Sequence, residues 1–178
     1  EVQPADPYRG RAGRYGALSG GFDFRVTDWS RISSAFEKDG SLRDIYILDT
    51  SLAEWEKIWG FLLERRASLT LQVGGEQVSL PNHAEPIFAA RDRGDTATLS
   101  CRLGDVTLNC HFYIREEVEF DVDPGDVRDA GDANHVARFM VGLCEATGRE
   151  VLLTAENNRD GVIAKVEPGD GAVRWQPS

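Results

Sequence analysis

Residues 96–122 of the chain read TATLSCRLGDVTLNCHFYIREEVEFDV. Apolar and polar residues alternate on both sides of the dipeptide Gly104-Asp105, which is typical of a two-residue β-hairpin turn. Such a turn places Leu103 opposite Val106, and every other residue of the two strands then falls on a defined face. One face of the hairpin is predicted to hold only apolar side chains: Leu99, Cys101, Leu103, Val106, Leu108, Cys110 and Phe112. The stretch therefore predicts an antiparallel sheet with one face packed against a core.

A third strand follows the hairpin, and the same alternation predicts its register. A two-residue turn would place carboxylates on the apolar face, whereas a three-residue loop, Arg115-Glu116-Glu117, keeps that face apolar. In the second register the apolar pairs are Ile114 with Val118, Phe112 with Phe120 and Cys110 with Val122. The polar pairs are Tyr113 with Glu119, His111 with Asp121 and Asn109 with Asp123.

The rest of the chain contains helices and further short strands. A capping box at Ser51-Leu52-Ala53-Glu54 begins a helix with one apolar stripe. A second amphipathic helix is predicted to have Asp132 as its N-cap and to stop at Gly148. Helical spacing is also seen over 29–36, whereas 87–90 fits either a helical turn or a strand. Strands are predicted at 22–26, 45–48, 69–73, 77–80, 151–153 and 162–166, with 45–48 central and an edge strand near 173–175.

This order of elements predicts an α+β fold, mainly an antiparallel meander sheet with two to three helices packed on one face. The 178 residues are enough for one domain. Residues 1–21 contain prolines, glycines and arginines without apolar periodicity, so they are predicted to form a flexible Gly/Arg-containing N-terminal arm. Residues 22–178 are predicted to form the single α+β domain.

The charge of the chain is acidic and concentrated. The formal net charge is −10, which argues against nucleic-acid binding because that binding relies on Lys and Arg neutralising phosphates. Residues 116–132 contain eight acidic residues and one arginine, so this segment alone carries a net charge of −7. The predicted partner is therefore another protein with a basic surface.

The three cysteines, Cys101, Cys110 and Cys144, are too few for a disulfide scaffold and are predicted to be buried, reduced thiols. No apolar run approaches the roughly 20 residues of a membrane helix. These features predict a cytoplasmic protein that does not associate with membranes.

The third strand and its flanks carry the candidate site. Its predicted partner-binding residues are His111, Tyr113, Glu116, Glu117, Glu119, Asp121, Asp123 and Asp126. Three interpretations stay open at this point. The carboxylates can form an ordinary solvated strand face, a patch that binds a partner, or a metal-binding or catalytic site.

A metal site would use Asp121, Asp123 and Asp132. If Asp121 is position one of a calcium-binding loop, then Asp123 stands correctly at position three. Gly125, Asp126 and Asp132 depart from that pattern at positions five, six and twelve. No zinc spacing, phosphate-binding loop or nucleophile elbow is found. The sequence therefore predicts no catalytic residue and no cofactor.

Three strings resemble a group of small bacterial proteins of unknown function: LRDIYI at 42–47, VEFDVDP at 118–124 and VLLTAEN at 151–157. The resemblance spans about residues 42–157. It implies a bacterial, cytoplasmic setting and transfers no activity.

The leading hypothesis is a non-catalytic binding protein, such as a bacterial immunity protein that covers the basic site of a toxin. One alternative is a metal-assisted hydrolase or nuclease that uses Glu119, Asp121, Asp123 and His111. The other alternative is a regulatory or structural subunit of an oligomer.

Overall fold

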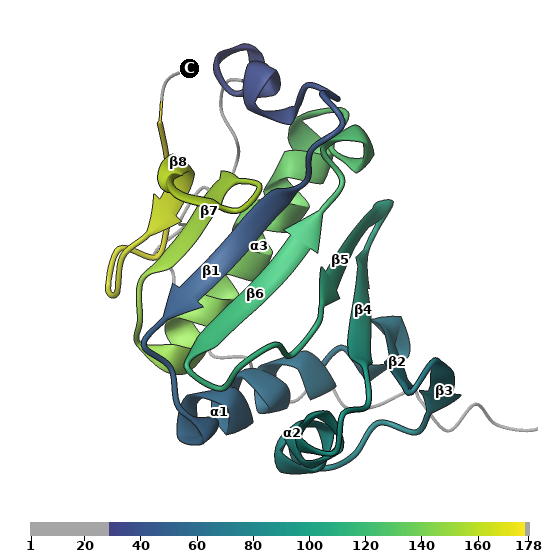
Figure 1. Cartoon of the computed structure of the whole chain (residues 1–178). Coiled ribbons are helices and arrows are strands. Elements are labelled where there is room, and N and C mark those ends of the chain that lie inside the picture. Colours follow the sequence, from purple (N-terminus) through teal and green to yellow (C-terminus); the bar gives the residue numbers. More distant parts are fainter. Residues whose placement is uncertain (1–28, 177–178) are drawn as a thin grey trace, which may run out of the picture.

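The computed structural model describes residues 29–176, and in this range the chain forms three α-helices and one nine-stranded sheet (Figure 1). The helices are α1 (Leu52–Leu63), α2 (Glu85–Asp92) and α3 (Ala130–Thr147). The strands are β1 (Arg43–Leu48), β2 (Leu69–Val73), β3 (Glu76–Val78), β4 (Ala97–Leu103), β5 (Val106–Cys110), β6 (Glu117–Val122), β7 (Val151–Ala155), β8 (Asn158–Val166) and β9 (Arg174–Trp175). Four short 3-10 helices are η1 (Trp29–Arg31), η2 (Ser33–Phe36), η3 (Arg66–Ser68) and η4 (Pro124–Asp126).

Every pair of neighbouring strands is antiparallel, in the order β3-β2-β4-β5-β6-β1-β7-β8-β9. The predicted α+β class with a mainly antiparallel meander is therefore confirmed. β1 interrupts the meander by lying between β6 and β7, and this central place explains why its residues from Arg43 to Ile47 are all buried.

The helices lie on one side of this sheet, and α3 runs behind β1 and β6 in Figure 1. Trp55, Ile58, Trp59 and Leu62 of α1 are buried in one core with the apolar faces of α2, α3 and the strands. The predicted capping box is formed by Ser51 and Glu54 at the start of α1. We call the opposite side of the sheet, which the helices do not cover, the outer face.

The N-terminus of α3 differs from its prediction. Asp129, not Asp132, is the N-cap, because its carboxylate accepts hydrogen bonds from the backbone N–H groups of Gly131 and Asp132 at 2.7 and 3.0 Å. Asp132 lies in the first turn, where a carboxylate interacts favourably with the helix dipole. The C-terminus is confirmed, because Gly148 follows the helix with a left-handed φ of 68°.

The first hairpin register is confirmed: Leu103 lies opposite Val106, and Cys101 opposite Leu108. The register of the third strand is wrong by two residues. Cys110, not Phe112, pairs with Phe120, and Leu108 pairs with Val122. A shift of two residues keeps each side chain on its predicted face, because the side-chain period of a strand is two.

Phe112 is the cause of this shift. Its backbone takes a left-handed φ of 50°, so β5 ends at Cys110 and residues 111–114 leave the sheet. The Phe112 ring is buried against Trp55, Trp59 and Phe88, with ring centroids 5.2 to 6.3 Å apart. Burial of an aromatic ring in such a cluster offsets the cost of the unfavourable backbone conformation.

The structure also tests the predictions for several shorter segments. Residues 87–90 belong to a helix, α2, and residues 29–36 form two 3-10 helices instead of an α-helix. The three cysteines are buried and free, as predicted, and burial raises the pKa of the Cys101 thiol to about 11. The predicted arm at 1–21 and the predicted strand at 22–26 lie outside the described residues.

Candidate functional site

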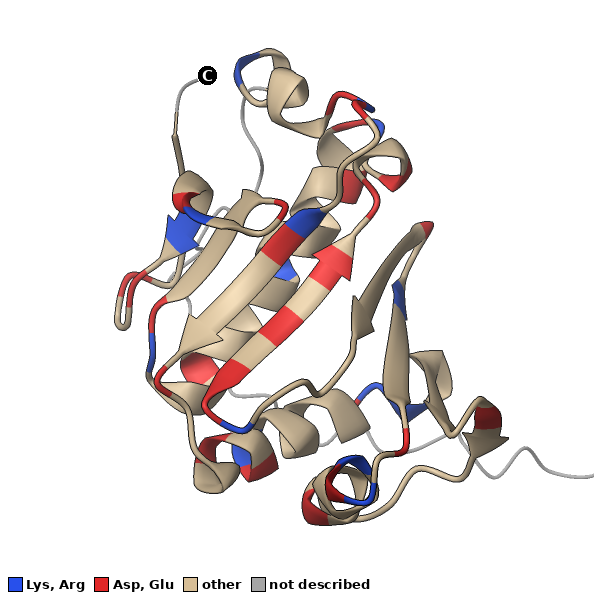
Figure 2. Cartoon of the chain, viewed as in Figure 1, with Lys and Arg blue, Asp and Glu red and all other residues tan. Residues whose placement is uncertain are grey.

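Four carboxylates on two adjacent central strands form an acidic stripe on the outer face. Glu117, Glu119 and Asp121 lie on β6, and Asp44 lies on β1 directly opposite Asp121. Figure 2 shows the acidic positions as repeated red bands along β6 beside β1. Like charges placed directly opposite each other on neighbouring strands are destabilising, so the surroundings of each carboxylate decide what this stripe can do.

Asp121 is held by neighbouring side chains. It is only 8% exposed, and its two oxygens accept hydrogen bonds from Asn109 Nδ2 at 3.1 Å and from His111 Nε2 at 2.9 Å. The other ring nitrogen of His111 lies 3.3 Å from the hydroxyl of Thr98 on β4. Because Nε2 donates to Asp121, Nδ1 can accept from that hydroxyl, and the two contacts fix the orientation of the imidazole. Each Asp121 oxygen thus has a protein donor.

Asp44 is the most deeply buried carboxylate of the stripe, at 2% exposure. It accepts hydrogen bonds from the backbone N–H of Asn157 at 2.7 Å and from the hydroxyl of Tyr46 at 3.0 Å. Burial, and then the charges of Asp121 and Glu156, nevertheless raise the pKa of Asp44 above its ordinary value. The same environment raises the pKa of Tyr46.

Glu117 is paired with a cation at the start of β8. Its carboxylate forms an ion pair with Arg159 at the start of β8. The Arg159 guanidinium also lies 5.6 Å from the ring centroid of Tyr46, within the range of a cation–π interaction. This arginine therefore supplies positive charge at one end of the acidic stripe.

Glu119 is the member of the acidic stripe that remains unpaired. Among the described residues no hydrogen-bond or ion-pair partner lies within reach of its carboxylate. Partial burial raises the pKa of Glu119, and the charges of Asp44, Glu117 and Asp121 raise it further, against a smaller opposing effect of His111. A half-buried carboxylate in this setting is a place where an added cation would be bound favourably.

Two adjacent residues in the loop that leads from β5 to β6 have exposed apolar side chains. Tyr113 and Ile114 are 57% and 49% exposed, and the Tyr113 ring stacks on His111 with centroids 5.4 Å apart. Partial burial, together with the charges of Glu119 and Asp121, raises the pKa of the Tyr113 hydroxyl.

The loop that carries these two side chains is firmly held. The Arg115 carbonyl accepts hydrogen bonds from Trp55 Nε1 at 3.1 Å and from the Thr50 hydroxyl at 2.9 Å. The Arg115 side chain forms a two-bond ion pair with Asp92, at 2.6 and 3.2 Å. With Phe112 buried on the other side, the exposed pair is presented by a loop fixed at both ends.

Most of the other acidic residues of 116–132 have structural roles. Asp123 caps η4 by accepting from the Gly125 N–H at 2.7 Å, and Asp126 accepts from the Thr107 N–H at 3.3 Å. Asp132 accepts from the backbone N–H and the Nε of Arg128. Glu116 is exposed at the turn before β6. Of the predicted carboxylates, Glu117, Glu119 and Asp121 thus belong to the acidic stripe, whereas Asp123 and Asp126 are bonded to backbone N–H groups. Glu116 belongs to neither set.

The candidate metal ligands do not form a common site in the described residues. No group of three or more His, Cys, Asp or Glu side chains in residues 29–176 is arranged to hold a metal ion. Asp121, Asp123 and Asp132 each accept hydrogen bonds from separate protein groups instead. The calcium-loop alignment therefore has no counterpart in the described geometry.

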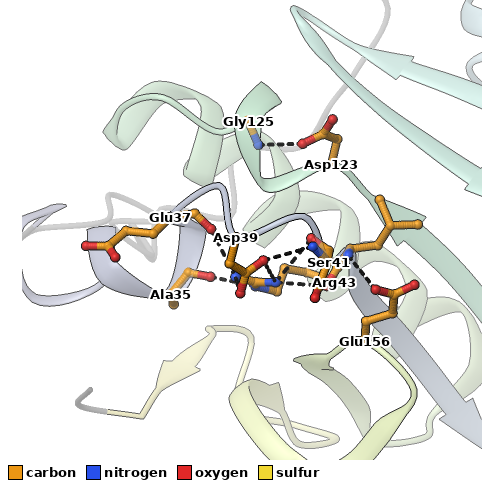
Figure 3. Close-up of polar contacts among 9 residues, drawn as sticks. Ala35, Glu37, Asp39, Ser41, Arg43, Asp123, Gly125 and Glu156 are labelled. Atoms are coloured by element: carbon orange, nitrogen blue, oxygen red, sulfur yellow. Dashed lines mark hydrogen bonds and ion pairs between the residues drawn. The ribbon is translucent and has the colours of Figure 1, made fainter.

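A second polar cluster lies around Arg43 at the start of β1 (Figure 3). The buried guanidinium donates to the carbonyls of Ala35, Glu37, Ser41 and Leu42 and to the carboxylate of Asp39. It also borders a cavity of about 420 Å³ that Glu156 and Asn157 help to line. Because each nitrogen of the guanidinium already has an acceptor, Arg43 organises residues 35–42 instead of pointing a free donor at a ligand.

Comparisons with protein-family models, curated proteins and solved structures found no match to this chain. None of the helices in residues 29–176 has the length and apolar character of a membrane span. Function is therefore inferred from the geometry of the outer face.

Proposed function

We propose that this chain is a non-catalytic binding protein that receives a basic partner protein on the outer face of its sheet. The observation that carries the proposal is Glu119, a half-buried carboxylate with no partner among the described residues and with three other carboxylates around it. A Lys or Arg side chain of the partner would pair with Glu119 and reduce the repulsion within the acidic stripe.

The form of the surface supports binding over catalysis. Within residues 29–176 the outer face is the side of the sheet opposite the helices. The carboxylates of the acidic stripe other than Glu119 accept hydrogen bonds from protein donors. Both ring nitrogens of His111 lie within hydrogen-bond distance of side chains of the sheet, Nε2 of Asp121 and Nδ1 of Thr98. An inhibitor of a basic toxin is one special case of this proposal.

The test compares charge removal on the outer face with the same charge removal elsewhere. Binding of an octa-arginine peptide is titrated calorimetrically to the full-length protein, to Glu119→Gln and to Glu145→Gln, whose exposed side chain lies on α3. We expect about fivefold weaker binding for Glu119→Gln, the upper range for a single partly exposed ion pair. Glu145→Gln should bind like the unmodified protein.

Ionic strength provides a second measurement. Screening weakens interactions between exposed charges, so binding should decrease with added salt, and the difference between the two variants should shrink with it. Equal affinity of Glu119→Gln and Glu145→Gln would show that the peptide responds only to the overall net charge, and the proposal would then be wrong.

A further inference from the structure

The exposed pair Tyr113 and Ile114 has no role in the packing of the core. Single exposed apolar residues are normal on protein surfaces and need no explanation. These two are adjacent and are the most exposed large apolar side chains among the described residues. Tyr113 stacks on His111, whose ring is hydrogen-bonded to Asp121 of the acidic stripe. The third exposed side chain of this kind, Val78, is at the far edge of the sheet on β3.

The geometry of the loop favours a binding role for the pair. The Tyr113 ring stacks on His111 on one side, and the residue as a whole is 57% exposed. An exposed tyrosine ring near carboxylates attracts a Lys or Arg side chain, since the ring quadrupole and the carboxylates both favour a cation. Ile114 beside it can only be covered favourably by an apolar group.

We propose that the partner binds through a segment in which an arginine or lysine stands next to a large apolar residue. The cation would lie between Glu119 and the ring of Tyr113, and the apolar side chain would cover Ile114. This inference rests on the proposed function, because it assumes that the outer face receives a basic protein, and it adds the kind of segment that is recognised.

A preorganised loop makes such a contact more favourable. Phe112 is buried in the aromatic cluster and the Arg115 carbonyl is bonded by Trp55 and Thr50, so the loop has little freedom to lose on binding. Tyrosine is also one of the residues that are enriched in interaction hot spots.

The experiment uses four synthetic peptides of equal length that differ only at two adjacent central positions: Arg-Leu, Arg-Ser, Ser-Leu and Ser-Ser. Affinities are measured by calorimetric titration of the full-length protein and of three variants. The variants are Glu119→Gln, the double variant Tyr113→Ser with Ile114→Ser, and Val78→Ser as the matched control for loss of an exposed apolar side chain.

We expect the Arg-Leu peptide to bind best, about tenfold more tightly than Arg-Ser, as for a modest hot spot. That leucine-dependent gain should disappear in the double variant and persist in Val78→Ser. The arginine-dependent gain should fall in Glu119→Gln. Because the altered loop side chains are exposed, thermal unfolding of the double variant should match that of the unmodified protein, which checks that the fold is intact.

The possible failures are distinguishable. If arginine contributes through Glu119 but leucine adds nothing, or adds equally in the double variant, the further inference is wrong and the proposed function stands. If arginine adds nothing in any protein, both fail. If leucine alone contributes and does so through Tyr113 and Ile114, the site is an apolar one and the basic partner is excluded.

Discussion

Replacing Glu119 by glutamine should make the protein more stable at neutral pH. The structure gives two reasons: the carboxylate is half-buried, and Asp44, Glu117 and Asp121 are close enough to raise its pKa. A glutamine side chain at this position would be similar in shape and would remove the charge without breaking any hydrogen bond found among the described residues. The side chain that we propose for partner binding would thus reduce stability in the unbound protein.

The expected size of this stabilisation follows from the neighbouring carboxylates. The residue directly opposite Glu119 is Tyr46, so its carboxylate neighbours are two residues away along β6 or diagonal on β1. Each of these repulsions should lie near the lower end of the about 0.2–1 kcal/mol that a directly opposed pair contributes. Asp121 and Glu117 are already bonded to His111 and Arg159, so their repulsion of Glu119 is partly relieved, and Asp44 adds a third contribution. Adding the cost of partly burying the charge, we expect Glu119→Gln to raise the free energy of unfolding by about 1 kcal/mol, or the Tm by about 2–4 °C for a chain of this size.

The stabilisation by Glu119→Gln should depend on pH. The folded-state pKa of Glu119 lies above its ordinary value of 4.5. Below 4.5 the carboxyl is protonated in both the folded and the unfolded chain, so it costs nothing. As the pH rises from 4.5 through the raised pKa, the folded state loses stability, and the full penalty is present above it.

Urea denaturation at neutral and at acidic pH measures this difference directly. The stabilisation by Glu119→Gln should be present at neutral pH and vanish at about pH 3, and Glu145→Gln should show no such change. Destabilisation at neutral pH, or the same stabilisation at both pH values, would refute the view that repulsion within the acidic stripe costs stability.

Three further predictions concern the scaffold. Arg43→Met should lower the free energy of unfolding by about 3 kcal/mol, since it removes a buried guanidinium and leaves part-buried carbonyls without a donor. Asp39→Asn, at an exposed acceptor, should cost clearly less in the same urea titration. Gly142→Ala should lower the Tm by several degrees, because a Cβ there would overlap the Phe61 ring and cost about 1–3 kcal/mol; a Tm equal to that of the unmodified protein would contradict this. The thiol of Cys110, buried and with a raised pKa, should react with a thiol reagent only at the rate of unfolding; rapid labelling of the folded protein would show that the sheet opens there.

The sequence predicted the hairpin between β4 and β5 correctly because a two-residue turn leaves one register. The predicted register of the next strand was wrong because that register depends on residues elsewhere in the chain. Phe112 leaves the sheet to pack against Trp55 and Phe88 from two helices, and no local pattern shows which aromatic rings will meet. The side-chain faces were still right, since a shift of two residues preserves them.

The most buried carboxylate of the acidic stripe was missed for a similar reason. Asp44 stands in a strand whose following residues are apolar, and sequence reasoning treated that strand as part of the core. Its place opposite Asp121 follows from the insertion of β1 between β6 and β7, which is a property of the topology. The sequence did contain one indication of this role. Asp44 is a charged residue at the start of a strand predicted to be central, and a charged side chain buried there requires bonded partners.

Counting carboxylates along a segment measures its charge but not its capacity to bind. In residues 116–132 four carboxylates are bonded to backbone N–H groups: those of Asp123, Asp126, Asp129 and Asp132. A partner's cation could pair with one of these carboxylates only at the expense of such a bond. Glu117 and Asp121 already have side-chain donors. Glu119 differs because a cation can bind it without breaking a bond within the described part of the chain. The binding capacity of the outer face therefore depends on this one unpaired carboxylate, and Glu119→Gln should affect binding more than any neutral substitution at a capping position that leaves the fold intact.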